Sequence, residues 1–133
     1  MRIGFLFITL TCILLAACKG GSKNQEESST KPKITFKDNT YNFGNVSIGE
    51  EVTHDFVFKN TGEKSLIIKD LKAGCGCTVP YYNGKPVQPK DTGSIKIEFK
   101  PAIQDLGTNN KSVFVYSNAE DGVKILTIKA KVR

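Results

Sequence analysis

The stretch VTHDFVFK at residues 52–59 decides the fold, because apolar and polar side chains alternate along most of its length. Val52, Phe56 and Phe58 share one side of an extended chain with His54. A period of two residues is typical of a β-strand with one buried face. The stretch therefore predicts a strand whose inner face carries two phenylalanines and the single histidine of the chain.

The same alternation recurs in SIKIEFK at residues 94–100 and in LTIKAKV at residues 126–132. Asn, Gly, Pro and Asp separate such runs, because these residues accept or preset the backbone angles of reversals. Strands are predicted near residues 34–37, 41–46, 51–59, 65–72, 94–100, 111–117 and 123–132. About seven short strands predict an all-β protein with a single immunoglobulin-like antiparallel β-sandwich. A small β-barrel is the alternative architecture.

The N-terminus reads as an export signal. Arg2 precedes an apolar segment at residues 3–15, which is shorter than the roughly 20 residues that a membrane-crossing helix needs. The sequence LAAC at residues 15–18 resembles the lipobox of bacterial lipoproteins. That resemblance implies cleavage before Cys18 and acylation of Cys18, for example with palmitate. The alternative is an ordinary signal peptide in which Cys18 is incidental.

The chain is therefore expected to have three parts. Residues 1–17 form the lipoprotein signal peptide, residues 18–33 the lipidated cysteine and a flexible linker, and residues 34–133 the sandwich domain. The linker has no apolar residue able to seed a core, so its composition is typical of a disordered segment. We expect a cell-envelope protein held by its lipid anchor on a membrane, the outer membrane with the domain facing the periplasm or the surface.

A set of short motifs resembles one bacterial family. The motifs are YNFGNV at 41–46, GE at 49–50, FVFKNTG at 56–62, CGCT at 75–78, FKP at 99–101 and VYSN at 115–118. They resemble the Cys-Gly-Cys-containing immunoglobulin-like domains of unknown function found in Bacteroidetes-type lipoproteins. Those domains look related to Hydin-like and major-sperm-protein-like sandwiches. The resemblance spans residues 34–132 and implies a fold and a compartment, but no reaction. Pro89-Lys90 departs from the Pro-Gly that the family often shows there.

Cys75 and Cys77 are the sharpest local feature, and four interpretations stay open. Neighbouring thiols in an oxidising compartment tend to form a disulfide, so a mainly structural local bridge, or two small buried thiols, is one interpretation. The others are redox exchange with a partner, binding of Cu(I) by two thiolates, and a disulfide to another envelope protein. Zinc would need four ligands, and His54 is the only histidine.

No catalytic residues are predicted, and the chain is not expected to be an enzyme or to need a cofactor or metal. His54 has no nucleophile elbow, paired metal-binding histidine or glycine-rich phosphate loop to act with. The formal charge is +6, and removal of Arg2 with the leader would leave +5. The lysines are spread over outward strand positions, as in edge protection, so no nucleic-acid partner is expected.

Two aromatic pairs are candidate contact surfaces. Tyr81 and Tyr82 are expected in a loop just after the cysteine pair, and tyrosine is enriched in recognition surfaces. Phe114 and Tyr116 alternate with Val113 and Val115, so one of these pairs must face away from the core. The sequence thus favours a binding or structural module whose partner is an envelope protein or a glycan. The alternative is a thiol-redox or copper-handling protein acting through its cysteine pair.

Overall fold

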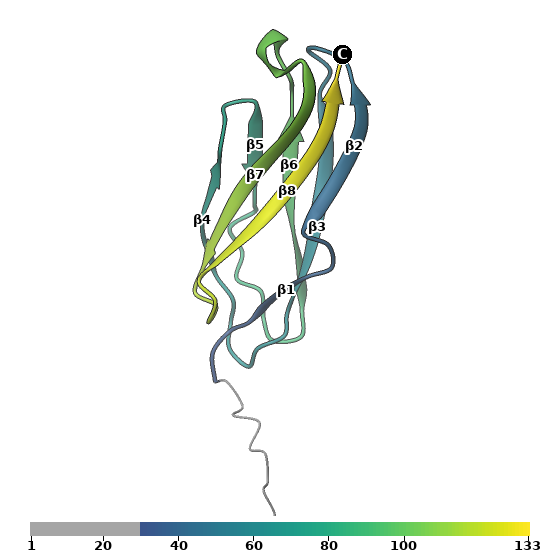
Figure 1. Cartoon of the computed structure of the whole chain (residues 1–133). Helices are drawn as coiled ribbons and strands as arrows, with labels where there is room; N and C mark the ends of the chain where they lie inside the picture. Colours follow the sequence, from purple (N-terminus) through teal and green to yellow (C-terminus); the bar gives the residue numbers. More distant parts are fainter. Residues whose placement is uncertain (1–29) are drawn as a thin grey trace, which may run out of the picture.

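The computed structural model describes residues 30–133, which form two four-stranded sheets packed face to face (Figure 1). The predicted signal peptide, Cys18 and the linker up to residue 29 lie outside the described residues. The elements are β1 (Ile34–Phe36), β2 (Thr40–Val46), β3 (Val52–Asn60), β4 (Ile68–Ala73), β5 (Thr78–Tyr81), β6 (Thr92–Phe99), the 3₁₀ turn η1 (Ile103–Asp105), β7 (Gly107–Ser117) and β8 (Val123–Val132).

The strand order is β1-β3-β6-β5 in one sheet and β2-β8-β7-β4 in the other. The predicted all-β, immunoglobulin-like sandwich is thereby confirmed. Among residues 30–133, no helix has the length and apolar character that crossing a bilayer requires.

The core lies between the sheets and comes from alternating residues of the facing strands. Phe56 and Phe58 of β3 and Ile95, Ile97 and Phe99 of β6 are all buried. On the facing sheet the buried residues are Val113, Val115, Leu126, Ile128, Ala130 and Val132. The two-residue period therefore predicted the inner faces of β3, β6 and β8 correctly, because each of these strands is buried on one side only. For β7 the sequence left two pairs open, and the structure places Val113 and Val115 inward.

Strand β5 differs from the prediction, which placed a loop here. Thr78–Tyr81 pairs with β6 alone, and Pro80 lies opposite Ile97. A proline lacks the backbone N–H and is tolerated in an edge strand. The strand is only four residues long, so it has too little alternation to be recognised from sequence.

The direction of β2 also differs from a purely antiparallel sandwich. β2 pairs with β8 in parallel, starting at Thr40 opposite Thr127. The chain leaves β1 in one sheet and crosses at residues 37–39 into the other, where β2 runs in the direction of β8 (Figure 1). This crossover makes one continuous N-terminal segment serve as an edge of both sheets.

The first described residues of the chain pass beside the turn at residues 60–62, which is held by the side chain of Asn60. Asn60 is fully buried, and its amide nitrogen donates to the carbonyls of Lys64 (2.7 Å) and Val87 (2.9 Å). Its side-chain oxygen accepts from the Gly62 amide at 3.0 Å. A Cβ at Gly62 would lie 2.4 Å from the carbonyl oxygen of Lys31, so only glycine fits beside the entering chain. The predicted turn at residues 60–62 thus also holds the entry point of the N-terminal segment.

Candidate functional site

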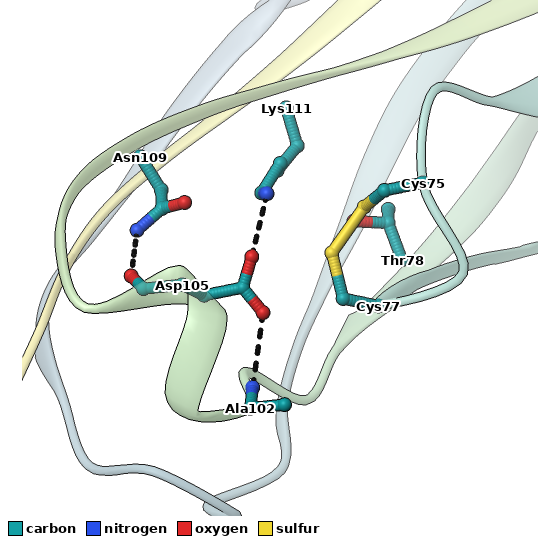
Figure 2. The surroundings of a disulfide bond; sticks show 7 residues. All are labelled: Cys75, Cys77, Thr78, Ala102, Asp105, Asn109 and Lys111. Carbon is teal, nitrogen blue, oxygen red and sulfur yellow. Dashed lines mark hydrogen bonds and ion pairs between the residues drawn. A yellow bond between two sulfur atoms is a disulfide. The ribbon is translucent and has the colours of Figure 1, made fainter.

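Cys75 and Cys77 are bonded to each other in the turn between β4 and β5 (Figure 2). Their Cα atoms are 5.4 Å apart, within the usual disulfide range of roughly 4.4–6.8 Å. An extended chain would separate them by roughly 6.5–7 Å, since each residue advances about 3.3 Å. The turn removes this difference, because the Thr78 amide donates to the Cys75 carbonyl at 3.4 Å.

The disulfide turn is fastened to both sheets. The Gly74 amide donates to the Ser112 carbonyl of β7 at 3.1 Å, and the Lys100 amide donates to the Cys77 carbonyl at 3.0 Å. The hydroxyl of Thr78, a buried residue, lies 3.5 Å from the Cys75 sulfur. Both cysteines are half-buried, so the sulfur bridge is partly accessible.

A partly buried ion pair lies next to the disulfide (Figure 2). The Lys111 ammonium is 2.7 Å from a carboxylate oxygen of Asp105, whose side chain is only 6% exposed. The other carboxylate oxygen accepts the Ala102 amide at 3.0 Å, and the Asn109 side chain donates to the Asp105 carbonyl. These contacts tie the 3₁₀ turn η1 to the first part of β7.

The charge of Asp105 is part of this arrangement. Hydrogen bonds from Lys111 and from the Ala102 amide hold the pKa of Asp105 below its ordinary value of 3.8, although burial acts in the opposite direction. The carboxylate is therefore ionised at neutral pH and balances the ammonium beside it.

Three apolar side chains are exposed near the disulfide and the Asp105–Lys111 pair. Ile103 and Leu106 flank Asp105 and are 66% and 55% exposed, and Ile48 in the β2–β3 turn is also exposed. The Gly49 amide donates to the Pro101 carbonyl at 2.8 Å, which joins the β2–β3 turn to the segment before η1. We call residues 47–51, 74–77 and 100–106 the tip. The tip lies at the end of the sandwich opposite the point where the chain enters (Figure 1).

The sequence singled out the cysteines of the tip but not its other members. The Asp105–Lys111 pair joins a turn to a strand six residues later, and no motif marks it. The one available signal was the pattern of apolar Ile103 and Leu106 in a connection that should be polar.

Tyr81 and Tyr82 have different environments. Tyr81 ends β5 and is exposed. Tyr82 is half-buried, its hydroxyl donates to the Lys85 carbonyl, and its ring lies 6.1 Å from that of Phe58. Burial raises the pKa of Tyr82. Tyr82 therefore packs against the core, and Tyr81 is the member of the pair that is open to a partner.

Phe114 and Tyr116 are the outward pair of β7, because Val113 and Val115 are fully buried. Both rings are half-buried by their cross-strand neighbours. Lys72 of β4 places its ammonium 5.3 Å from the centre of the Tyr116 ring. β7 begins at Gly107, next to the tip, so Phe114 and Tyr116 lie seven and nine residues further along the strand.

His54 is packed rather than free. Its ring stacks on Tyr41 with centroids 3.5 Å apart and contacts Phe56 edge-on at 4.8 Å. Burial lowers the pKa of His54, against the opposing effects of Asp55 and Asp38. His54 therefore closes the gap between β2 and β3. In the part of the chain that the structure describes, no cluster of three His, Cys, Asp or Glu residues has metal-site geometry.

The family described as "Protein of unknown function (DUF1573)" matches residues 34–132. No curated protein matches the chain.

Among solved structures, a protein of unknown function from Porphyromonas gingivalis W83 is similar, with a TM-score of 0.69 and 10% identity. The match covers 83% of this chain and 51% of that protein, so this chain spans about half of its length.

Two other solved domains are also similar to this chain in fold. One is the ASH/PapD-like domain 7 of human CEP192, with a TM-score of 0.56, 11% identity, and 100% and 96% of the two chains covered. The other is SSP-19, an MSP-domain-like protein of Caenorhabditis elegans, with a TM-score of 0.56, 11% identity, and 73% and 98% covered. These likenesses show the fold alone.

Proposed function

The chain belongs to the DUF1573 family, and we propose that it is a lipid-anchored cell-envelope module that binds another protein through its tip. The family has an unknown function, and the similar MSP and PapD-like domains show the fold alone. The proposal therefore rests on the geometry of the tip.

The observation that carries the proposal is that apolar side chains are exposed on loops fixed by a partly buried ion pair and a disulfide. Asp105 bonds both Lys111 and the Ala102 amide, and this fixes the turn from which Ile103 and Leu106 project. A loop needs no such arrangement to connect two strands. Exposed apolar residues on a rigid support are typical of a protein-binding surface.

The location of the tip supports a tethered role. β7 has 11 residues, so it separates the two ends of the sandwich by roughly 35 Å. If Cys18 carries acyl chains, the entry point is the end of the domain joined to the anchor, and the tip is the end away from the point of attachment. The lipid would then hold the protein at the membrane, and the linker would set how far the domain reaches from it. The tip would contact a second envelope protein.

The test is photo-crosslinking in intact cells with a benzophenone amino acid at Leu106. The matched control is Val79, which is 54% exposed on β5 outside the tip. We expect Leu106 to yield a discrete adduct that Val79 does not, and Ile103→Asp to abolish it. Equal adducts from both positions, or none from Leu106, would contradict the proposal. Mass spectrometry of the intact protein with Cys18 and with Cys18→Ser tests the anchor separately.

One observation favours a second candidate, thiol exchange. The Cys75–Cys77 bridge is only half-buried and lies on the same surface. A partner dithiol would reduce it, giving two thiols here and a disulfide in the partner. Counting free thiols in the isolated protein, with and without Cu(I), separates the candidates. Two reactive thiols that bind the metal stoichiometrically would support the redox or copper-handling role instead of binding by the oxidised tip.

A further inference from the structure

A groove of about 770 Å³ lies at the other end of the sandwich, between the β1–β2 crossover and the first residues of β8. Residues 33–40 form one wall, and residues 121 and 123–125 form the other. The groove shares no residue with the tip.

Among residues 30–133, the β8 wall is a strand edge to which no other strand pairs. β8 pairs with β7 from Val123 onward, but its pairing with β2 begins only at Thr127. The Thr127 amide donates to Asn39 at 2.8 Å on the β2 side. Backbone groups alternate direction along a strand, so Ile125 points its N–H and C=O to that same side. The groove lies on this side of β8 at Ile125, before β2 begins to pair with β8 at Thr127.

The β1 wall is also an open edge. The Lys37 amide donates to Val57 at 3.0 Å, and the Lys33 carbonyl accepts from Thr61 at 2.9 Å, so the odd-numbered residues bond to β3. The backbone groups of Ile34 and Phe36 between them therefore point away from β3. The crossover of the chain from one sheet to the other leaves two short edges facing the same space.

The side chains around the groove favour an apolar and acidic occupant. Ile125 is 51% exposed and Val123 is also exposed, and they lie opposite Phe114 and Tyr116 of β7 on the outer face. The charged residues of the lining are Lys33, Lys37, Lys124, Asp38 and Asp121. Asp121 is paired with Lys124, so lysine is in excess.

We propose that this groove binds an extended segment of another polypeptide, which adds as a strand to the open edge of β8. Main-chain hydrogen bonds to Ile125 supply the pairing, in the manner of strand addition to a sheet edge. The segment alternates apolar residues, which extend the outer apolar face, with acidic residues, which meet the lysines. This site is independent of the tip, so either proposal can fail without the other.

The test uses the full chain, purified in detergent micelles, and a labelled synthetic peptide of about nine residues, an ordinary strand length, in which valine or isoleucine alternates with glutamate. A control peptide has proline at every apolar position, so the residues whose side chains would extend the outer apolar face have no main-chain N–H to donate. Fluorescence anisotropy measures affinity, and hydrogen exchange locates the contact. The protein variants are Ile125→Glu and, as a matched exposed position on another edge strand, Val79→Glu.

We expect the alternating peptide to bind, to slow exchange of the Ile125 amide, and to bind about tenfold more weakly to Ile125→Glu, because of like-charge repulsion, than to Val79→Glu. Equal binding of the proline peptide, or a dissociation constant above about 1 mM for both peptides, overturns the proposal. Slow exchange of the Ile125 amide without peptide also overturns it. A mass that rises with concentration would then identify a second copy as the occupant, and a constant mass would identify the N-terminal segment of the chain itself.

Discussion

Replacing Asp105 with asparagine tests whether the ion pair supports the tip. Asparagine keeps an oxygen to accept the Ala102 amide, so Asp105→Asn removes the charge and little else. Lys111 then retains its ammonium with only 21% of its side chain in water. Breaking a fully buried pair costs about 3–5 kcal/mol, and breaking an exposed one about 0–1 kcal/mol. The intermediate exposure of Lys111 places the expected loss of unfolding free energy at about 2 kcal/mol.

The assay is urea unfolding at neutral pH, with Lys111→Met and the double variant completing a cycle. The double variant leaves no unpaired charge, so we expect it to be no less stable than either single variant. The stabilisation by Asp105 is present above the ordinary pKa of 3.8 and is lost as the pH falls through its lowered folded-state pKa. The wild-type advantage over Asp105→Asn should therefore shrink in acid. A loss below about 0.5 kcal/mol, or additive losses in the cycle, would refute the reasoning.

Three further predictions concern stability. Gly62→Ala should cost about 2–3 kcal/mol in urea unfolding, because its Cβ would overlap backbone atoms, while Gly76→Ala, with open space around it, should be neutral. Replacing Cys75 and Cys77 with serine should cost about 1.5 kcal/mol, since the closed loop is short, and reductant should destabilise only the wild type. Burial lowers the pKa of His54 in the folded state, so the unfolded chain binds the proton first and stability falls as the pH drops below 6.5; His54→Phe should flatten that part of the pH profile.

The sequence predicted those parts of the fold in which local pattern and tertiary burial agree. The strands β3, β6 and β8 each alternate over eight or more residues, and each buries one face. The stretch at residues 52–59 was therefore sufficient to identify a half-buried strand and the side on which its phenylalanines lie.

The remainder depends on contacts between segments that are distant in the chain. β5 is short and contains Pro80, so only its pairing with β6 defines it. The parallel pairing of β2 follows from the crossover after β1, which no local pattern marks.

In the candidate site, too, one part could be predicted from local sequence and the other could not. The cysteines were visible because their chemistry is rare, and a local bridge was among the interpretations. The grouping of Ile48, Ile103 and Leu106 required three loops to meet, and the charge balance of Asp105 required Lys111 from the following strand. A sequence pattern can predict which residues are apolar, but not which loops converge.

The most direct test of the central claim is hydrogen exchange of the protein bound to the partner recovered through Leu106. The account predicts slower exchange at residues 47–51, 74–77 and 100–106, with the opposite end of the sandwich unchanged by this partner. Protection confined to residues 33–40 and 121–125, with unchanged exchange at the three loops, would contradict it.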